Sequence, residues 1–208
     1  MSIVSIVYFP FFILFYEHIQ QYTLVLYKNI FLYNKMGNTA CNETKHSKNA
    51  IATLVSEKVN GYVVFHQCGP SNQVTVHFMI RGPSNQTHAI HIHEFGDLRK
   101  GCDSLGSHFN PTDDTHGSIM YNMPRHAGDL INNIVFNNEG IFEYKYYDDS
   151  ISLYQGPRCI LGRSIVIHEK ADDLGLGLGV SKEESLKTGN AGKRICCSVI
   201  GLAQSEHF

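Results

Sequence analysis

Residues 50–204 consist of short runs in which apolar and polar residues alternate, separated by stretches rich in glycine, proline, asparagine and serine. Alternation with a period of two is typical of strands with one buried face. It is clearest in residues 74–81 and 87–94, and no part of this region carries a convincing amphipathic helix of three turns. These runs predict an all-β fold of about eight strands, arranged as an antiparallel sandwich or barrel.

The other strands are expected at intervals along the same region. Residues 50–67 contain two β-rich runs joined by Asn60-Gly61, which predicts a hairpin with its turn there. Further strands are predicted at 132–136, 140–146, 150–153, 164–168 and 194–203. The two longest stretches without strands, 95–130 and 170–193, are longer than ordinary loops and are therefore expected to be functional.

The chain divides into four parts by composition. Residues 1–35 are an apolar extension, 36–49 a polar linker, 50–204 the predicted domain and 205–208 a tail. The uncharged run 3–16 is interrupted by Pro10, is short for a membrane span, and lacks the basic start of a signal peptide. Three interpretations stay open: a true start at Met36, which implies a cytoplasmic protein; a secretory signal, which implies an extracellular one; or a membrane anchor.

Charge composition excludes one class of function. The chain has 17 Lys and Arg against 19 Asp and Glu, a net charge of -2, and only 17% charged residues. A nucleic-acid-binding role is therefore not expected. Any attraction of a charged partner must come from local placement of charges.

Histidine is abundant, with 12 in 208 residues, and several are spaced as metal ligands. His91 and His93 stand two apart on a predicted strand, so their side chains leave the same face. The first long loop contains three further histidines and a carboxylate, a complete tetrahedral zinc set: His108, His116, His126 and Asp129. His168 ends a predicted strand just before the second long loop.

Five sequence blocks, in order, resemble the copper/zinc superoxide dismutases over roughly residues 50–204. They are HIHEFGD (91–97), GC with GSHFNP (101–102 and 106–111), RHAGDL (125–130), HEKADDLG (168–175) and KTGNAGKR (187–194). The resemblance implies an eight-stranded Greek-key barrel or sandwich with two long functional loops. It also implies one copper and one zinc ion per subunit.

The resemblance assigns each metal its ligands. It places His91, His93, His108 and His168 on copper, and His108, His116, His126 and Asp129 on zinc, so that His108 bridges the two ions. Asp172 matches a carboxylate that hydrogen-bonds one histidine of each site. Arg194 matches the arginine that attracts and orients the anionic substrate, and Lys187, Glu183 and Glu184 match residues that guide it electrostatically.

The implied activity is dismutation of superoxide to dioxygen and hydrogen peroxide by alternating reduction and oxidation of copper, with an antioxidant role. In that mechanism His108 handles the proton. Because every ligand position is filled, the enzyme is favoured over two alternatives. A metal-holding relative without turnover would not need Arg194, and a zinc-only module would not explain His91, His93 and His168.

The resemblance also implies a disulfide between Cys102 and Cys197. Cys159 is expected to pack as a small apolar residue, and Cys41 and Cys68 to be free thiols. The family usually forms homodimers, for which residues near Ile160 and 199–202 are candidates, although they could equally be core. A copper chaperone is a possible partner. Residues 117–125 depart from the family in length and are unusually apolar, which puts the geometry of the zinc loop in question.

Overall fold

The computed structural model describes residues 47–204. The expectations for the apolar extension (1–35), most of the polar linker and the tail (205–208) therefore lie outside the described residues. Within residues 47–204 no helix is long and apolar enough to span a membrane.

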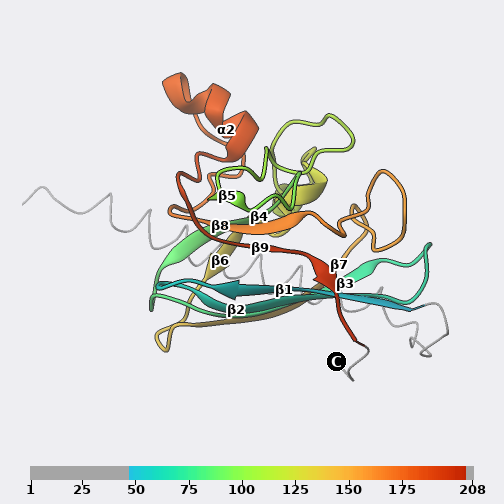
Figure 1. Ribbon diagram of the computed structural model, residues 1–208. Helices are drawn as coiled ribbons and strands as arrows, with labels where there is room; N and C mark the ends of the chain where they lie inside the picture. The colour runs from blue at the N-terminus through green and yellow to red at the C-terminus, as the bar shows by residue number, and fades with distance from the viewer. Residues whose placement is uncertain (1–46, 205–208) are drawn as a thin grey trace, which may run out of the picture. The chain divides into compact units, whose positions relative to one another are not determined.

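Two antiparallel sheets face each other as two layers (Figure 1). The strands of the first are β1 (Lys48–Val55), β2 (Asn60–Gln67), β3 (Val74–Arg81), β7 (Ile141–Asp148) and β10 (Gly201–Leu202), in the order β10-β1-β2-β3-β7. Those of the second are β4 (Thr87–His93), β6 (Asn133–Val135), β8 (Ser164–His168) and β9 (Arg194–Val199), in the order β6-β4-β8-β9. A short strand, β5 (Arg99–Cys102), lies in the first long loop. The chain crosses between layers after β3, β6, β7 and β9, as in a Greek key, so the predicted all-β fold is confirmed.

The hydrophobic core fills the space between the two sheets. Phe65 of β2 and Phe78 of β3 are fully buried, and so are Ile90 of β4 and Ile165 of β8 in the other layer. Burying a side chain of this size contributes about 1.5–3 kcal/mol. The sandwich is therefore a stable base for the loops.

The strands β4 and β8 differ from the others because nearly every residue in them is buried. Ile90 and Ile92 belong to the core cluster. Because side chains alternate along a strand, His91 and His93 leave the opposite face of the sheet. Their burial shows that the long loops cover this outer face.

The predicted β1–β2 hairpin forms, but the prediction of its turn at Asn60-Gly61 is wrong. The chain turns at residues 56–59, where the Ser56 N–H donates to the Val59 carbonyl over 2.9 Å. Gly61 lies in β2, opposite Leu54, with φ +140°. A Cβ atom there would lie 2.2 Å from the Met79 carbonyl oxygen, so the close approach of β3 requires this glycine.

Two other strand predictions need correction. Residues 150–153 form no strand, only an isolated bridge between Ser152 and Cys159, because the Leu153 N–H donates to the side chain of Gln67 over 2.7 Å. The predicted strand at 194–203 divides into β9 and β10 at Ile200, which is fully buried. Ile160 is also fully buried, so both residues belong to the core.

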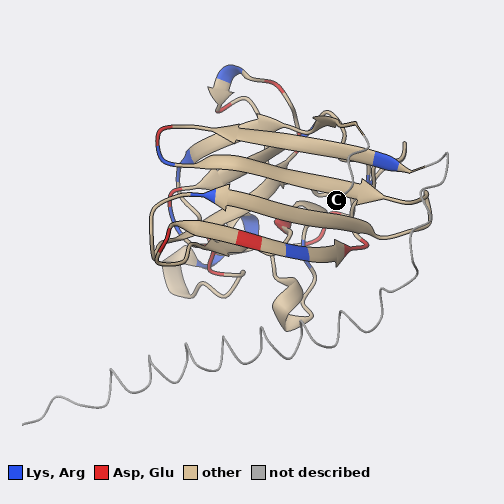
Figure 2. Cartoon of the chain, turned by 90° about the horizontal axis from the view of Figure 1, so that it is seen from below, with Lys and Arg blue, Asp and Glu red and all other residues tan. Residues whose placement is uncertain are grey.

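The described part of the chain has only short helices, all in the long loops. They are η1 (Ile119–Tyr121), η2 (Ala127–Asp129), η3 (Gly179–Ser181) and α2 (Lys182–Thr188). Figure 2 shows that most charged residues lie in loops and at strand ends rather than on the face of the five-stranded sheet. The charges that could act on a ligand therefore come mainly from the loops.

Candidate metal centre

Two strands and one loop bring four imidazoles together. The end of β4 supplies His91 and His93, and the end of β8 supplies His168. A β-bulge between Ile167 and His168 shifts the register, so that His168 pairs with Arg194 at the start of β9. Bulges re-aim side chains at functional sites, and this one places His168 and Arg194 side by side.

His108 comes from the first long loop but is held like a strand residue. It forms an isolated antiparallel bridge with His93. The Glu94 N–H donates to Ser107 over 2.9 Å, and the Phe109 N–H donates to Ile92 over 2.8 Å. The loop is therefore fixed to the end of β4 on both sides of His108.

The ligand nitrogens of His91, His93, His108 and His168 all lie within 4.8 Å of one another. The outer nitrogens of three of these rings have fixed partners: His93 Nδ1 lies 3.0 Å from the Gly106 carbonyl, His168 Nδ1 lies 3.1 Å from that of Gly192, and His91 Nε2 lies 2.7 Å from Asp172 Oδ2. A proton on each outer nitrogen leaves a lone pair on the inner one. The inner nitrogens therefore converge, and the group could hold a metal ion.

A second set of donors surrounds one carboxylate oxygen. Asp129 Oδ1 lies 3.0 Å from His108 Nδ1, 2.9 Å from His116 Nδ1 and 3.1 Å from His126 Nδ1. The other oxygen, Oδ2, accepts from the N–H groups of His126 and Gly117 over 2.9 and 3.2 Å. Three nitrogens therefore surround one carboxylate oxygen. The greater length of residues 117–125, compared with the family pattern, does not separate these four donors.

Asp172 connects the two sets. Its Oδ2 lies 2.7 Å from His91 Nε2, and its Oδ1 lies 2.9 Å from His116 Nε2. The amide of Asn132, which sequence reasoning missed, donates to Asp172 Oδ2 over 3.1 Å and to the Gly117 carbonyl over 2.9 Å. Asn132 is fully buried, and its backbone is left-handed with φ 61°. No local sequence motif predicted that its side chain would hold Asp172.

Burial and these contacts shift the pKa values of the ligands. Burial, and then the neighbouring His108, lower the pKa of His91 to about 3, and burial lowers that of His168 to about 4. Burial also lowers the pKa of His116, but hydrogen bonds to Asp129 and Asp172 outweigh it and raise the value to about 9. Burial alone would raise the pKa of Asp129, yet hydrogen bonds from three histidines hold it well below its usual range. At neutral pH His91 and His168 are therefore neutral and ready to bind a cation.

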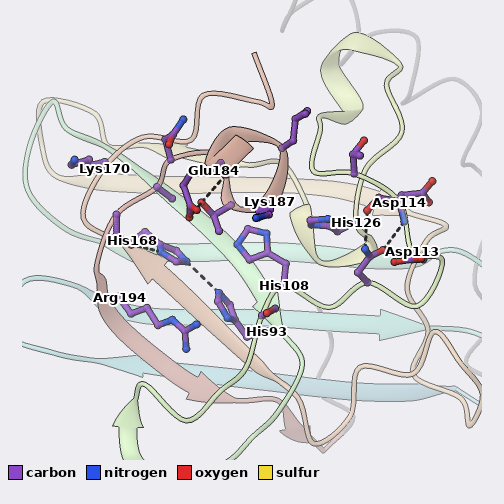
Figure 3. Close-up of a pocket in the computed structure, with 18 residues that line it drawn as sticks. His93, His108, Asp113, Asp114, His126, His168, Lys170, Glu184, Lys187 and Arg194 are labelled. Atoms are coloured by element: carbon purple, nitrogen blue, oxygen red, sulfur yellow. Dashed lines mark hydrogen bonds between the residues drawn. The ribbon is translucent and has the colours of Figure 1, made fainter. Parts of the chain in front are cut away.

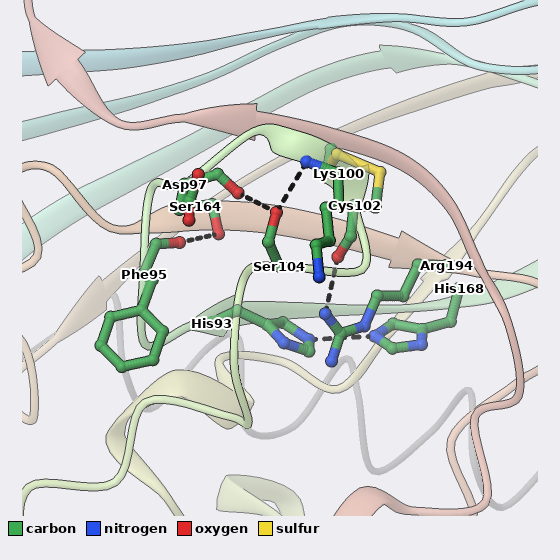
Figure 4. Close-up of a disulfide and its surroundings, with 10 residues drawn as sticks. His93, Phe95, Asp97, Lys100, Cys102, Ser104, Ser164, His168 and Arg194 are labelled. Atoms are coloured by element: carbon green, nitrogen blue, oxygen red, sulfur yellow. Dashed lines mark hydrogen bonds between the residues drawn. A yellow bond between two sulfur atoms is a disulfide. The ribbon is translucent and has the colours of Figure 1, made fainter.

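Arg194 lies beside the first set, held by two carbonyl groups of the first long loop (Figure 4). Its Nη1 donates to Cys102 over 2.6 Å and its Nη2 to Gly106 over 2.5 Å. A disulfide joins Cys102 to Cys197, as expected, across 95 residues. The disulfide therefore fixes one of the carbonyls that orient the guanidinium.

An open cavity of about 770 Å³ leads to these residues (Figure 3). His93, His108, His168 and Arg194 line its inner part, and Glu184 and Lys187 of α2 line its rim. Lys187 forms an ion pair of 2.7 Å with Glu183, which does not line the cavity. A small anion entering this cavity would meet Arg194 next to the imidazoles.

The other histidines and cysteines have separate roles. His88 Nδ1 lies 2.8 Å from the His168 carbonyl, which agrees with a structural hydrogen bond. Cys159 and Cys196 are free, the first half-buried and the second buried. The prediction that Cys68 is a free thiol is wrong, because this residue is disulfide-bonded. Cys41 lies outside the described residues.

The sequence and the fold are both similar to known proteins. Residues 59–200 match the family profile described as copper/zinc superoxide dismutase (SODC). The chain is 44% identical over 160 residues to the copper-zinc superoxide dismutase of Onchocerca volvulus, which covers 77% of this chain and 99% of that protein. It is 40% identical to the extracellular copper-zinc superoxide dismutase of Brugia pahangi, over 83% of this chain and 85% of that one. Among solved structures, the clock protein EA4 is similar, with a TM-score of 0.69 and 42% identity over 77% of this chain and 98% of EA4.

Proposed function

The chain belongs to the copper/zinc superoxide dismutase family, and from that membership we propose which of its residues carry the activity. The protein dismutates superoxide to dioxygen and hydrogen peroxide, an antioxidant activity, with copper and zinc as cofactors. One observation carries the assignment: of the four buried side-chain atoms without a hydrogen-bond partner among the described residues, two, His91 Nδ1 and His108 Nε2, belong to the cluster of four imidazoles. The other two are His88 Nε2 and Asn132 Oδ1. A buried nitrogen left unpaired costs about 1–3 kcal/mol, so a bound metal ion accounts for the two atoms in the cluster.

Copper would be held by His91 Nδ1 and by the Nε2 atoms of three other residues, His93, His108 and His168. These nitrogens lie within 4.8 Å of one another and carry lone pairs directed by the hydrogen bonds on the far side of each ring. Imidazole nitrogen suits copper in either of its common oxidation states. The donor set fits this ion without a change of fold.

Zinc would be held by the Nδ1 atoms of His108, His116 and His126 together with Asp129. Three imidazoles and one carboxylate make a closed tetrahedral set, the usual form of a zinc site without open positions. Because His108 belongs to both sets through different nitrogens, it would bridge the two metals. Asp172, hydrogen-bonded to one histidine of each set, would fix both rings.

Bound copper would supply the one-electron oxidation and reduction that zinc cannot. Arg194 attracts superoxide and orients it, since its guanidinium lies beside His93 and His168 with its direction set by two carbonyls (Figure 4). His108 Nε2 is placed to hold a proton and return it to the reduced substrate, while Nδ1 keeps the ring near Asp129. Lys187 and Glu184, at the rim, act on the approaching anion, and Glu183 acts through its ion pair with Lys187.

Metal analysis of purified variants tests the assignment. Wild type loaded with both metals should hold one copper and one zinc ion per chain. His168→Ala should lose copper and keep zinc, because His168 belongs only to the copper set, and His126→Ala should lose zinc. His168→Ala protein that keeps copper at the wild-type level would contradict the assignment.

We also propose a homodimer, with the C-terminal strands as part of the interface. Leu202 is 72% exposed, and the neighbouring Val199 is half-buried. A surface of this kind gains stability when a second copy covers it. Sedimentation should give a dimer for wild type and a shift toward monomer for Leu202→Lys. A wild-type monomer at micromolar concentration would overturn the proposal.

Copper delivery and compartment are proposals as well. Four buried ligands favour delivery by a copper chaperone before the loops close. A protein that starts at Met36 is cytoplasmic, and one whose residues 1–35 contain a signal peptide is extracellular, as the Brugia pahangi relative is named. N-terminal sequencing of the natural protein distinguishes the two.

A further inference from the structure

The metal cavity is lined by as many acidic as basic side chains. The charged residues that line it are Asp113, Asp114, Glu184, Lys170, Lys187 and Arg194, so their formal charges cancel. One of the cations, Lys187, is already paired with Glu183. Superoxide is an anion, and its capture would be faster with a net positive rim. The acidic side chains therefore oppose the capture of the substrate.

The two signs of charge are separated across the cavity (Figure 3). Asp113 and Asp114 lie with His126 on one side, and Lys170 and Arg194 lie with His168 on the other. The sequence explains the separation, because the two carboxylates belong to the loop between the zinc ligands His108 and His116. Lys170 instead lies two residues after β8, and Arg194 is the first residue of β9.

Side-chain hydrogen bonds fix the turn that displays the two carboxylates. The Asn110 amide donates to the Asp114 carbonyl over 2.8 Å, and the Asp114 N–H donates back to Asn110 Oδ1 over 3.1 Å. The Thr112 hydroxyl donates to the Asp114 carboxylate over 2.5 Å. Both aspartates are exposed, and no ion pair with residues 47–204 neutralises either one. Their charges therefore act on whatever enters the cavity.

We propose that Asp113 and Asp114 determine the rate and the route of superoxide entry. Their charges repel the anion from the zinc-loop side of the cavity and leave the side of Lys170 and Arg194 as its path to the copper histidines. This proposal rests on the proposed function, because it concerns the substrate of the same site. The two aspartates thus limit the rate at which superoxide reaches the copper histidines.

The size of the effect follows from Coulomb attraction in water. Removing one negative charge about 10 Å from the path of a monovalent anion changes its local concentration about twofold at low ionic strength. Asp113→Asn is a clean probe, because Asp113 has φ 58° and asparagine adopts this left-handed conformation as readily. Asp114→Asn keeps an oxygen that can accept from Thr112.

The test measures kcat/KM for superoxide with the metal-loaded protein at an ionic strength of about 0.01 M, where the Debye length is about 30 Å. Asp113→Asn should raise kcat/KM about twofold, and Asp113→Asn with Asp114→Asn about fourfold. Glu139→Gln makes the same change of net charge at an exposed turn outside the cavity and should leave the rate unchanged. At about 1 M salt, where the Debye length is about 3 Å, the differences should vanish.

A second readout does not depend on turnover. Azide, a monovalent anion that ligates copper, should bind Asp113→Asn holoprotein more tightly than wild type by about the same factor of two at low salt. Equal azide affinity and equal kcat/KM in Asp113→Asn and Glu139→Gln would overturn the inference, as would an increase that persists at high salt. Inactive wild-type protein with both metals bound would instead refute the proposed function. The azide titration would still test whether Asp113 and Asp114 repel an entering anion.

Discussion

His108 is the residue on which both donor sets depend. Its Nδ1 lies 3.0 Å from Asp129 Oδ1, and its Nε2 is buried without a hydrogen-bond partner among the described residues. Among the described residues it alone belongs to both four-donor groups, because an imidazole carries one ligand nitrogen on each side of its ring. The spacing of the histidines predicted the pair His91 and His93 and the four donors of the first long loop, because alternation along a strand and clustering within one loop are visible in sequence. That His108 and His168 join the pair was implied only by the family resemblance.

The role of Asn132 could not be predicted from the spacing of residues in the sequence. Its amide reaches Asp172, which lies 40 residues away, from a left-handed backbone conformation. Contacts between residues so far apart depend on how two loops pack, and a single sequence does not encode this as a motif. Residues that support ligands are therefore harder to find than the ligands themselves.

Replacing Asn132 should weaken zinc binding. Asn132→Ala removes the amide that holds Asp172, so His116 loses its fixed orientation. We expect zinc affinity to fall about 10- to 100-fold, measured by competition with a chromophoric chelator. Asn137→Ala is the control, since Asn137 only caps the turn before β7 through the N–H groups of Glu139 and Ile141. Equal zinc affinity in the two variants would contradict the role of Asn132.

Position 189 requires a glycine because Asp172 and His116 lie close to its backbone. It has φ 64°, and a Cβ atom there would lie 2.2 Å from Asp172 Oδ1 and 2.6 Å from His116 Nε2. Gly189→Ala should therefore displace Asp172 and reduce the zinc content of the purified protein. Gly179→Ala has a similar φ, 62°, but nothing within 4 Å of its Cβ atom, so it should keep zinc. If both variants lose zinc equally, backbone strain rather than the clash is the cause.

Among the secondary-structure elements, the four-stranded sheet positions the site, because the copper histidines of β4 and β8 lie on its outer face. The strands β4 and β8 bury both faces, one against the core and one beneath the two long loops. Strand periodicity predicted β3 and β4 well because apolar and polar residues alternate there. It failed at 150–153, where the side chain of Gln67 satisfies the backbone, and at Asn60-Gly61, where the close approach of β3 explains the glycine.

The disulfide links the first long loop to β9 and should affect both stability and activity. Cys102→Ser with Cys197→Ser should lower the free energy of unfolding by about 4.7 kcal/mol at most, the chain-entropy value for a loop of about 100 residues. Because the Cys102 carbonyl holds Arg194, kcat/KM should fall as well. Urea unfolding and superoxide consumption measure the two effects.

Cys159→Ser is the matched control for the disulfide variant, since this half-buried thiol is free. It should leave both quantities close to wild type. A disulfide variant that is less stable yet fully active would show that Arg194 does not need the disulfide to keep its position.

For the whole molecule, the sheets and the loops are stabilised by different interactions. The largest fully buried side chains, such as Phe65, Phe78 and Ile90, lie mainly in the strands, whereas the loops converge on the metal ligands. Metal binding therefore adds stability mainly to the loops. The short alternating runs of residues 50–204 predicted the sandwich, but the placement of charges around the cavity could be seen only in the packed loops.

Removal of both metals should loosen the loops before the sheets. We expect a chelator-treated protein to melt more than about 10 °C lower than the metal-loaded one. Hydrogen exchange should increase in residues 95–130 and 170–193 while β1, β2 and β3 stay protected. Uniform loss of protection would show that the sandwich itself depends on the metals.

The most direct test is the rate of superoxide consumption by purified protein whose copper and zinc content has been measured in the same sample. Protein with one copper and one zinc ion per chain should consume superoxide catalytically. His168→Ala, which removes one of the four proposed copper ligands, should lose this activity while the fold and the zinc are kept. Wild-type protein that holds both metals and yet does not accelerate dismutation would contradict the account.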